Sequence, residues 1–195
     1  MPNQWSDRVS VQPVREPASL EDVRRNLDLD DSYRDADLSM WLTEARKQVE
    51  HDARTALITQ THITDAKGWG DICTLPAVWP VIAVSAITYE DTNGDTQTLA
   101  TTVYGVDVNQ RPARIYLKRE QTWPVLYGEH MDVHVTYTCG YGATPADVPG
   151  AARSAIFMLI RHRFDQPGVL VPAGMSETPE GYASAINQLR GGDYP

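Results

Sequence analysis

Cysteine and long apolar runs are both scarce in this chain of 195 residues. The two cysteines, Cys73 and Cys139, lie far apart and neither belongs to a CxxC motif, so we expect free thiols, with a disulfide as the alternative. No apolar run approaches the ~20 residues that a membrane helix requires. Residues 1–15 are polar and contain no apolar signal-peptide segment. We therefore expect a chain made in a cytoplasm, with no membrane partner.

Positive charge is also in deficit. The chain has 17 Lys and Arg against 26 Asp and Glu, which gives a formal net charge of −9. A protein that grips nucleic acid through its phosphates needs a surplus of clustered basic residues. This composition therefore excludes tight phosphate binding. It remains compatible with DNA passing nearby, because an acidic wall repels DNA.

Catalytic signatures are missing as well. The sequence contains no GxSxG elbow and no HExxH, and Gly140-Tyr141-Gly142 lacks the GK[ST] ending of a phosphate loop. Asp91–Asp95 resembles a calcium loop only superficially, because its glycine stands at the fourth position and Thr102 occupies the twelfth, where a glutamate is needed. We expect no catalytic residue, no metal and no cofactor.

One metal-site alternative stays open at His130, Asp132 and His134. On a strand, residues at i, i+2 and i+4 point to the same face. Two imidazoles and a carboxylate could hold zinc or iron with open positions, as in a metal-dependent enzyme. Side chains at this spacing are about 7 Å apart along a strand and rarely converge on one ion. The sequence therefore favours a solvated strand face.

Helical periodicity marks three segments. A capped helix is expected over residues 20–27, and a second over 35–55, where Leu38, Trp41, Leu42, Ala45 and Val49 form one stripe. A third is expected over 149–164, with its stripe at Ala152, Ala155, Ile156, Leu159 and Ile160. Phe157 and Met158 lie off that stripe, so this helix needs cover on two sides. Either the same domain or a neighbouring subunit could supply the second cover.

Residues 57–140 have the pattern of strands and turns. Asn93-Gly94 predicts a type I′ hairpin between two strand-length runs. Residues 1–17 are rich in proline and are expected to form an extended arm. Residues 166–195 are expected to form a loop and tail, in which 182–189 is a short amphipathic helix that must fold against its own domain or a partner. The expected runs are 57–64, 81–90, 96–99, 103–108, 114–118 and 131–138.

One further pattern lies in the order and spacing of many short segments. In the first part of the chain they are Glu16–Val23, Leu27–Asp31, Asp35, Asp37, Leu38–Val49, Glu50 and Arg54–Thr61. In the strand region they are Leu75-Pro76, Trp79–Val81, Val84, Ile87, Tyr89, Asp91–Asp95 and Tyr104–Asp107. The last are Trp123-Pro124, Val135–Tyr137, Gly140–Gly142, Val148-Pro149 and the third expected helix.

Together these segments resemble the HK97-type bacteriophage head–tail connector (adaptor) family. The resemblance covers roughly residues 14–165 and rests on order and spacing, since no single motif is diagnostic. Departures are Cys139, where the family has a small residue, the lack of a basic residue at Asn26-Leu27-Asp28, and the weak match of 165–195.

The resemblance implies an α+β fold, in which a small helical bundle (18–165) contains an inserted antiparallel β-domain. It implies a structural protein of the virion that forms a ring, twelve-fold in the family, docked on the portal protein. Such a ring joins the DNA-filled head to the tail or stopper, and DNA passes through its lumen without sequence-specific binding. The alternatives are another virion-associated completion protein, the metal-dependent enzyme and a monomeric ligand-binding module.

The same resemblance implies where neighbouring chains would meet this one. The C-terminal tail is the segment expected to reach the portal. The off-stripe residues of the third helix and the apolar residues of the arm are expected to be completed by neighbours. The interface candidates are therefore Tyr182, Ile186, Leu189, Phe157, Met158, Val9 and Val11.

Overall fold

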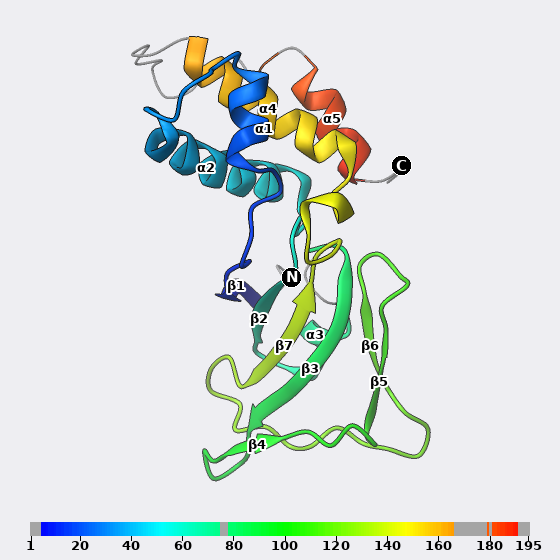
Figure 1. Ribbon diagram of the computed structural model, residues 1–195. Helices are drawn as coiled ribbons and strands as arrows, with labels where there is room; N and C mark the ends of the chain where they lie inside the picture. The colour runs from blue at the N-terminus through cyan, green and yellow to red at the C-terminus, as the bar shows by residue number, and fades with distance from the viewer. Residues whose placement is uncertain (1–4, 75–77, 166–178, 180, 191–195) are drawn as a thin grey trace. The chain divides into compact units, whose positions relative to one another are not determined.

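The computed structural model describes residues 5–74, 78–165, 179 and 181–190. The chain divides into two compact units, a sheet unit and a helical unit (Figure 1). The sheet unit combines Met1–Val14 with Thr59–Gly140, and the helical unit combines Arg15–Ile58 with Tyr141–Pro195. The fold is α+β, as the sequence predicts.

The sheet unit is built on a five-stranded sheet in the order β1-β2-β7-β3-β4, with every pair antiparallel. Side chains alternate between buried and half-buried positions along β2 and β7, because successive residues of a strand point to opposite faces. Val133, Val135, Tyr137 and Ile87 are fully buried on one face. The strands are β1 (Trp5–Val11), β2 (Gln60–Ala66), β3 (Val81–Glu90), β4 (Thr96–Thr98) and β7 (Val133–Cys139).

A second, two-stranded sheet and a short helix complete this unit. The strands are β5 (Tyr104–Asp107) and β6 (Arg114–Leu117), and the helix is α3 (Trp69–Ile72). Trp69 of α3 stacks on Trp123, with ring centroids 4.8 Å apart, and its indole Nε1 donates to the Pro124 carbonyl. These contacts hold the irregular segment around residues 119–131 against the unit.

The hairpin between β3 and β4 differs from the expected type I′ turn. That turn needs positive φ at both central residues, whereas only Gly94 has one, at 82°. Asp91 organises the loop instead, since its carboxylate accepts hydrogen bonds from the amides of Asn93 and Asp95 and from the Gln97 side chain. The side-chain acceptor supports a five-residue turn in place of the two-residue turn.

The N-terminal stretch also differs from a free arm. Residues 5–11 form β1, which pairs with β2 from Trp5↔Ala66 to Val11↔Thr61 and extends the expected 57–140 insertion by one edge strand. Apolar and polar residues alternate over too few positions here to predict a strand. The pairing could not be predicted either, because the partner strand lies more than 50 residues away. Cys73 and Cys139, also in this unit, are free thiols.

The helical unit contains α1 (Leu20–Asn26), α2 (Asp35–Ala53), a 3₁₀ turn η1 (Pro145–Asp147), α4 (Gly150–Asp165) and α5 (Tyr182–Arg190). Buried side chains of α2, α4 and α5 meet in one core, among them Leu38, Val49, Ile156 and Ile186. Two capping boxes set the entries to α1 and η1, through Ser19 with Asp22 and Thr144 with Asp147. No helix in the described part of the chain is long and apolar enough to cross a membrane.

Candidate interface site

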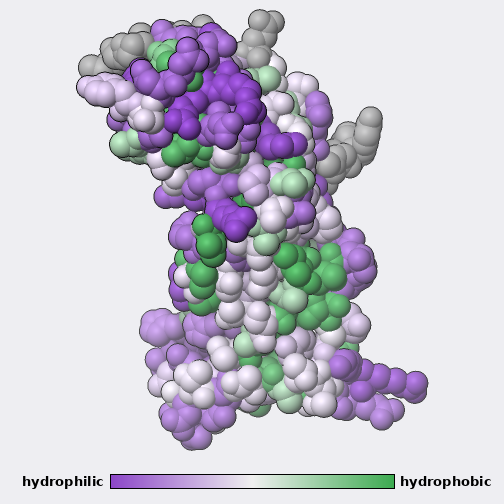
Figure 2. Space-filling model, viewed as in Figure 1, coloured by the Kyte–Doolittle hydropathy of each residue, from purple (hydrophilic) through white to green (hydrophobic). Residues whose placement is uncertain are grey.

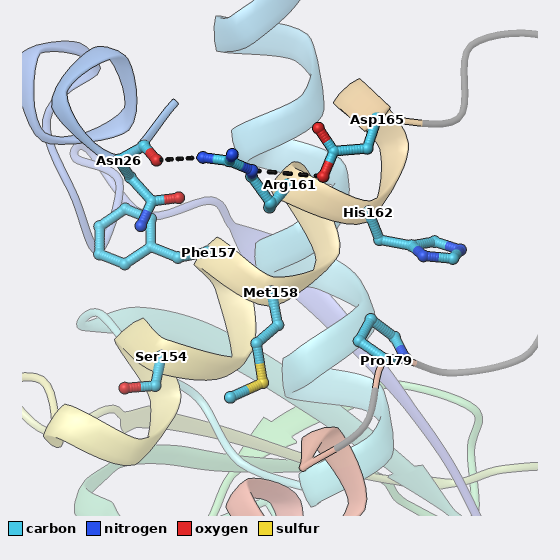
Figure 3. A pocket seen from close by; sticks show the side chains of 8 residues that line it. All are labelled: Asn26, Ser154, Phe157, Met158, Arg161, His162, Asp165 and Pro179. Carbon is cyan, nitrogen blue, oxygen red and sulfur yellow. Dashed lines mark hydrogen bonds and ion pairs between the residues drawn. The ribbon is translucent and has the colours of Figure 1, made fainter. Parts of the chain in front are cut away.

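The outer face of α4 carries two adjoining hollows in the helical unit, and Figure 3 shows the residues that line the larger one. They have volumes of about 670 and 450 Å³ and share Asn26, Ser154 and Phe157 in their lining. We call the pair the α4 groove. The smaller part adds Asp22 and Arg25 of α1 and Arg153 of α4. The larger part is lined by Asn26, Ser154, Phe157, Met158, Arg161, His162, Asp165 and Pro179.

Phe157 and Met158 supply the apolar lining of this groove. Both are only half-buried, although they pack on the core cluster formed by α1, α2, α4 and α5. In Figure 3, Phe157 extends toward Asn26, while Met158 points in a different direction from α4. The Met158 methyl lies beside Gly181 at the start of α5, where an added Cβ would come within 3.6 Å. The helical unit therefore covers one side of α4 and leaves these two residues with accessible surface.

Arg161 fixes one end of the groove. Its guanidinium donates to the Asn26 carbonyl at 2.9 Å and to the Asp165 carboxylate at 3.2 Å, as Figure 3 shows, and it lies 3.5 Å from Asp28. These bonds tie the C-terminal turn of α4 to the end of α1. The groove is therefore a preformed surface whose lining is held by the unit itself.

Three interface candidates from the tail lie elsewhere than expected. The side chains of Tyr182, Ile186 and Leu189 are at most 5% exposed and pack into the core of the helical unit. The Tyr182 hydroxyl donates to Asp52 at 2.8 Å, and burial together with that carboxylate raises the pKa of Tyr182. The apolar face of α5 is thus covered by α2 and α4 of the same chain, which corrects the expectation that a neighbour completes it.

The two candidates on the arm lie on the edge strand β1. Val9 is 39% exposed and Val11 is 55% exposed. Figure 2 shows, on the face in view, that hydrophobic colour gathers over the sheet unit, while the helical unit is largely hydrophilic. The sheet unit also exposes Ile82, Tyr116, Val125, Tyr127 and Met131.

The three residues of the metal-site alternative do not converge. Asp132 is fully buried and accepts hydrogen bonds from the backbone amides of Gly128 and His130. The His134 Nδ1 lies 2.7 Å from the Asp65 carboxylate, and His130 stands exposed on the preceding loop. Within the described residues, no group of three or more His, Cys, Asp or Glu side chains is placed to hold a metal ion.

A half-buried carboxylate, that of Asp7, fixes β1 to the sheet. Asp7 accepts hydrogen bonds from the hydroxyls of Thr64 and Tyr137, each at 2.9 Å, and its Oδ2 lies 2.7 Å from the His62 Nδ1. Burial, followed by the charge of Asp7, raises the pKa of Tyr137, which therefore stays a hydrogen-bond donor. The cluster is a structural anchor, because its members are engaged with one another.

A second buried network orders the segment before α1. Arg46, nearly buried on α2, donates to Glu16 and to Glu50 at 2.8 Å each. Glu50 also accepts the Leu57 amide at 2.9 Å, and burial raises the pKa of its carboxyl. The network joins Glu16, which precedes α1, to α2 and to Leu57, which follows α2. Its side chains are bonded to one another, so we assign it a structural role.

Sequence reasoning found Phe157 and Met158 but missed Arg153 and Arg161 beside them. A signal was present, because Arg153, Phe157 and Arg161 recur every four residues and must lie on one helical face. The contribution of Asn26 could not be found this way, because it depends on how α1 packs across α4.

Comparisons with known proteins identify the fold. No protein-family model matches the chain, and no curated protein sequence matches it. Solved structures of gene transfer agent particles do match. A chain from the neck of the native particle, computed with C12 symmetry, is 25% identical with a TM-score of 0.65, and the match covers 92% of this chain and 94% of that chain.

Two further structures agree. A chain from the neck of the empty particle, computed with C6 symmetry, is 23% identical with a TM-score of 0.72, over 92% of this chain and 94% of that chain. A chain from the virion of the native particle is 22% identical with a TM-score of 0.69, over 93% and 95% of the two chains. Over nearly its whole length, the chain shares the fold of chains found in the virion and neck of gene transfer agent particles.

Proposed function

We propose that this chain is a structural head–tail connector (adaptor) subunit of a tailed phage or phage-like particle. In this role it forms a ring docked on the portal protein and links the DNA-filled head to the tail or stopper. Its place is the head–tail junction of the virion. The function is mechanical and requires no catalytic group.

One observation carries the proposal. The fold matches a chain in the neck of a gene transfer agent particle over 92% of this sequence, in a structure computed with C12 symmetry. The sequence resemblance to HK97-type connectors, found independently over residues 14–165, points to the same position in a particle. The C12 symmetry supports a twelve-fold ring.

Composition agrees with a conduit role. A net charge of −9 disfavours adhesion to DNA, and DNA that must move through a ring gains from walls that do not bind it. The surface needed for assembly must then be supplied by particular patches and not by general electrostatic attraction. The α4 groove and the exposed valines of β1 are the candidates among the residues proposed from sequence.

Co-sedimentation with the cognate portal tests this role. The purified chain is mixed in excess with the portal and separated on a density gradient. The proposal predicts a heavier portal peak that contains the two proteins in equal subunit numbers. A portal that sediments unchanged in the presence of a large excess of the chain contradicts it.

The C-terminal tail remains the proposed portal-binding segment. Deleting residues 180–195 would remove α5, whose Tyr182, Ile186 and Leu189 belong to the core of the helical unit. Such a deletion would confuse loss of folding with loss of binding. A sharper test removes residues 191–195 alone: reduced portal binding by a folded protein supports the tail contact, and unchanged binding excludes it for those residues.

A further inference from the structure

Charge is distributed unevenly within the helical unit. Residues 150–165, which form α4, contain three arginines, one histidine and one aspartate. Residues 28–37, here called the acidic segment, contain five aspartates and one arginine. Asp28, Asp35 and Asp37 are ion-paired within the chain, whereas the exposed Asp30 and Asp31 have no ion pair among the described residues. Two surfaces of opposite charge on one chain can attract each other between copies, and complementary charge fixes the register of such contacts.

The acidic segment also presents an uncovered aromatic side chain. Tyr33 is 93% exposed, and Met40, one turn into α2, is 49% exposed. The Tyr33 amide bonds to the Asp31 carboxylate, so the backbone around it is ordered although the ring is free. Tyrosine is enriched at the centres of protein interfaces, where it supplies large contact area with few rotatable bonds.

The α4 groove has the matching features. Phe157 and Met158 provide apolar surface, and the larger hollow measures about 670 Å³. Arg161 and Arg25 are already paired with carboxylates of the same unit. The Arg153 side chain is exposed and makes no hydrogen bond or ion pair within the part of the chain that the structure describes. Its charge acts on Asp22 across the smaller hollow, but that carboxylate is bonded to Ser19, so the guanidinium can still meet a carboxylate from outside.

We propose that the acidic segment of one copy docks into the α4 groove of the next copy, with Tyr33 against Phe157 and Met158 and with Asp30 and Asp31 near Arg153. The contact joins two different surfaces, so a pair of copies retains one free acidic segment and one free groove. Repetition of such a head-to-tail contact closes into a ring when the rotation allows it. This inference rests on the proposed ring function and names the surfaces that build the ring.

Site-directed cross-linking tests the contact directly. In a Cys73→Ser background, Tyr33→Cys and Ser154→Cys are made separately and together, and assembly is carried out with the cognate portal. Copies carrying both cysteines should form a ladder of disulfide-linked oligomers, whereas a mixture of the single variants should stop at dimers. Tyr116→Cys with Ser154→Cys is the control, because Tyr116 lies on the sheet unit and is 52% exposed.

The outcomes separate this inference from the function on which it rests. A ladder for the paired variant and none for the control supports the contact. Rings that assemble on the portal without the ladder overturn the contact and leave the connector function standing. The absence of both rings and ladder rejects both. Cross-linking of Ser154→Cys to the portal instead would assign the groove to the portal and overturn the contact between copies.

Charge reversal gives an independent measure. Arg153→Glu should weaken association between copies by about tenfold or more, as loss of a charged interface contact does. Lys47→Glu, a similar reversal at an exposed position of α2, should leave association within about twofold of the original chain. Equal effects of the two reversals would mean that only overall charge matters, and would overturn the specific contact.

Discussion

At the scale of single residues, two largely buried carboxylates, Asp7 and Glu50, attach segments that are distant in the sequence to one another. Asp7 joins β1 to β2 and β7, and Glu50 with Arg46 joins α2 to the segments on either side of it. Neither role can be read from sequence, because each partner set spans 30 or more residues. Asp132, expected on a wet strand face, is instead a buried acceptor of the Gly128 and His130 amides, because the loop before β7 folds back over its carboxylate.

Removing the Asp7 carboxylate should destabilise the sheet unit. Asp7→Ala would leave the hydroxyls of Thr64 and Tyr137 and the His62 ring without their acceptor inside the fold, at a cost of about 2–3 kcal/mol. Urea denaturation measures the change, with Ser6→Ala on the exposed side of β1 as the control. A loss below about 0.5 kcal/mol, the size of an ordinary surface substitution, would show that Asp7 is not an anchor.

At the scale of elements, periodicity predicted most helices and strands, and packing decided what they contact. α2 and α4 begin and end within two residues of the expected bounds, because their apolar spacing is unambiguous. The covering of α5 could not be predicted, since an amphipathic helix fits its own domain or a partner equally well. The same holds for β1: its polar and apolar residues alternate over too few positions to predict a strand, and it forms one because it pairs with β2.

The two neighbours Ile156 and Phe157 on α4 should behave differently when truncated. Ile156 is fully buried in the core, so Ile156→Ala should lower the free energy of unfolding by about 2–5 kcal/mol. Phe157 is half-exposed in the α4 groove, so Phe157→Ala should cost clearly less stability and should weaken assembly more. Thermal unfolding together with portal co-sedimentation separates the two effects. A larger stability loss for Phe157→Ala would place it in the core and remove it from the interface.

The start of α1 should add acid sensitivity to the helical unit. Hydrogen bonds from the Ser19 hydroxyl and amide lower the pKa of Asp22 from its ordinary value of 3.8. A carboxyl whose pKa is lower in the folded state contributes stability above 3.8, and that contribution is lost as the pH falls through the lower, folded value.

Asp22→Asn should therefore flatten the fall in stability below this pH and lower stability at neutral pH. Denaturation measured across the acid range tests the expectation, with Glu21→Gln, which lacks the capping contact, as the control. Identical acid profiles for Asp22→Asn and the original chain would contradict the capping role.

At the scale of the whole molecule, the connector proposal rests on two observations. The chain is acidic, and its fold matches chains found in the necks of gene transfer agent particles. In that proposal, the net charge of −9 disfavours adhesion to DNA, and local surface patches make the contacts between subunits. The sequence resemblance and the structural comparisons point to the same position in a particle by separate routes. The α4 groove and the acidic segment are the surfaces proposed to join the subunits of the ring. They could not be identified from the sequence, because the exposure of Tyr33 and the hollow beside Phe157 depend on how the chain folds.

Electron microscopy of the chain mixed with its cognate portal, beside each component alone, tests the central claim most directly. The account predicts a ring of additional density under the portal, with the portal's symmetry, that is absent from the portal alone. A portal whose density is unchanged by a large excess of the folded chain would contradict the connector function.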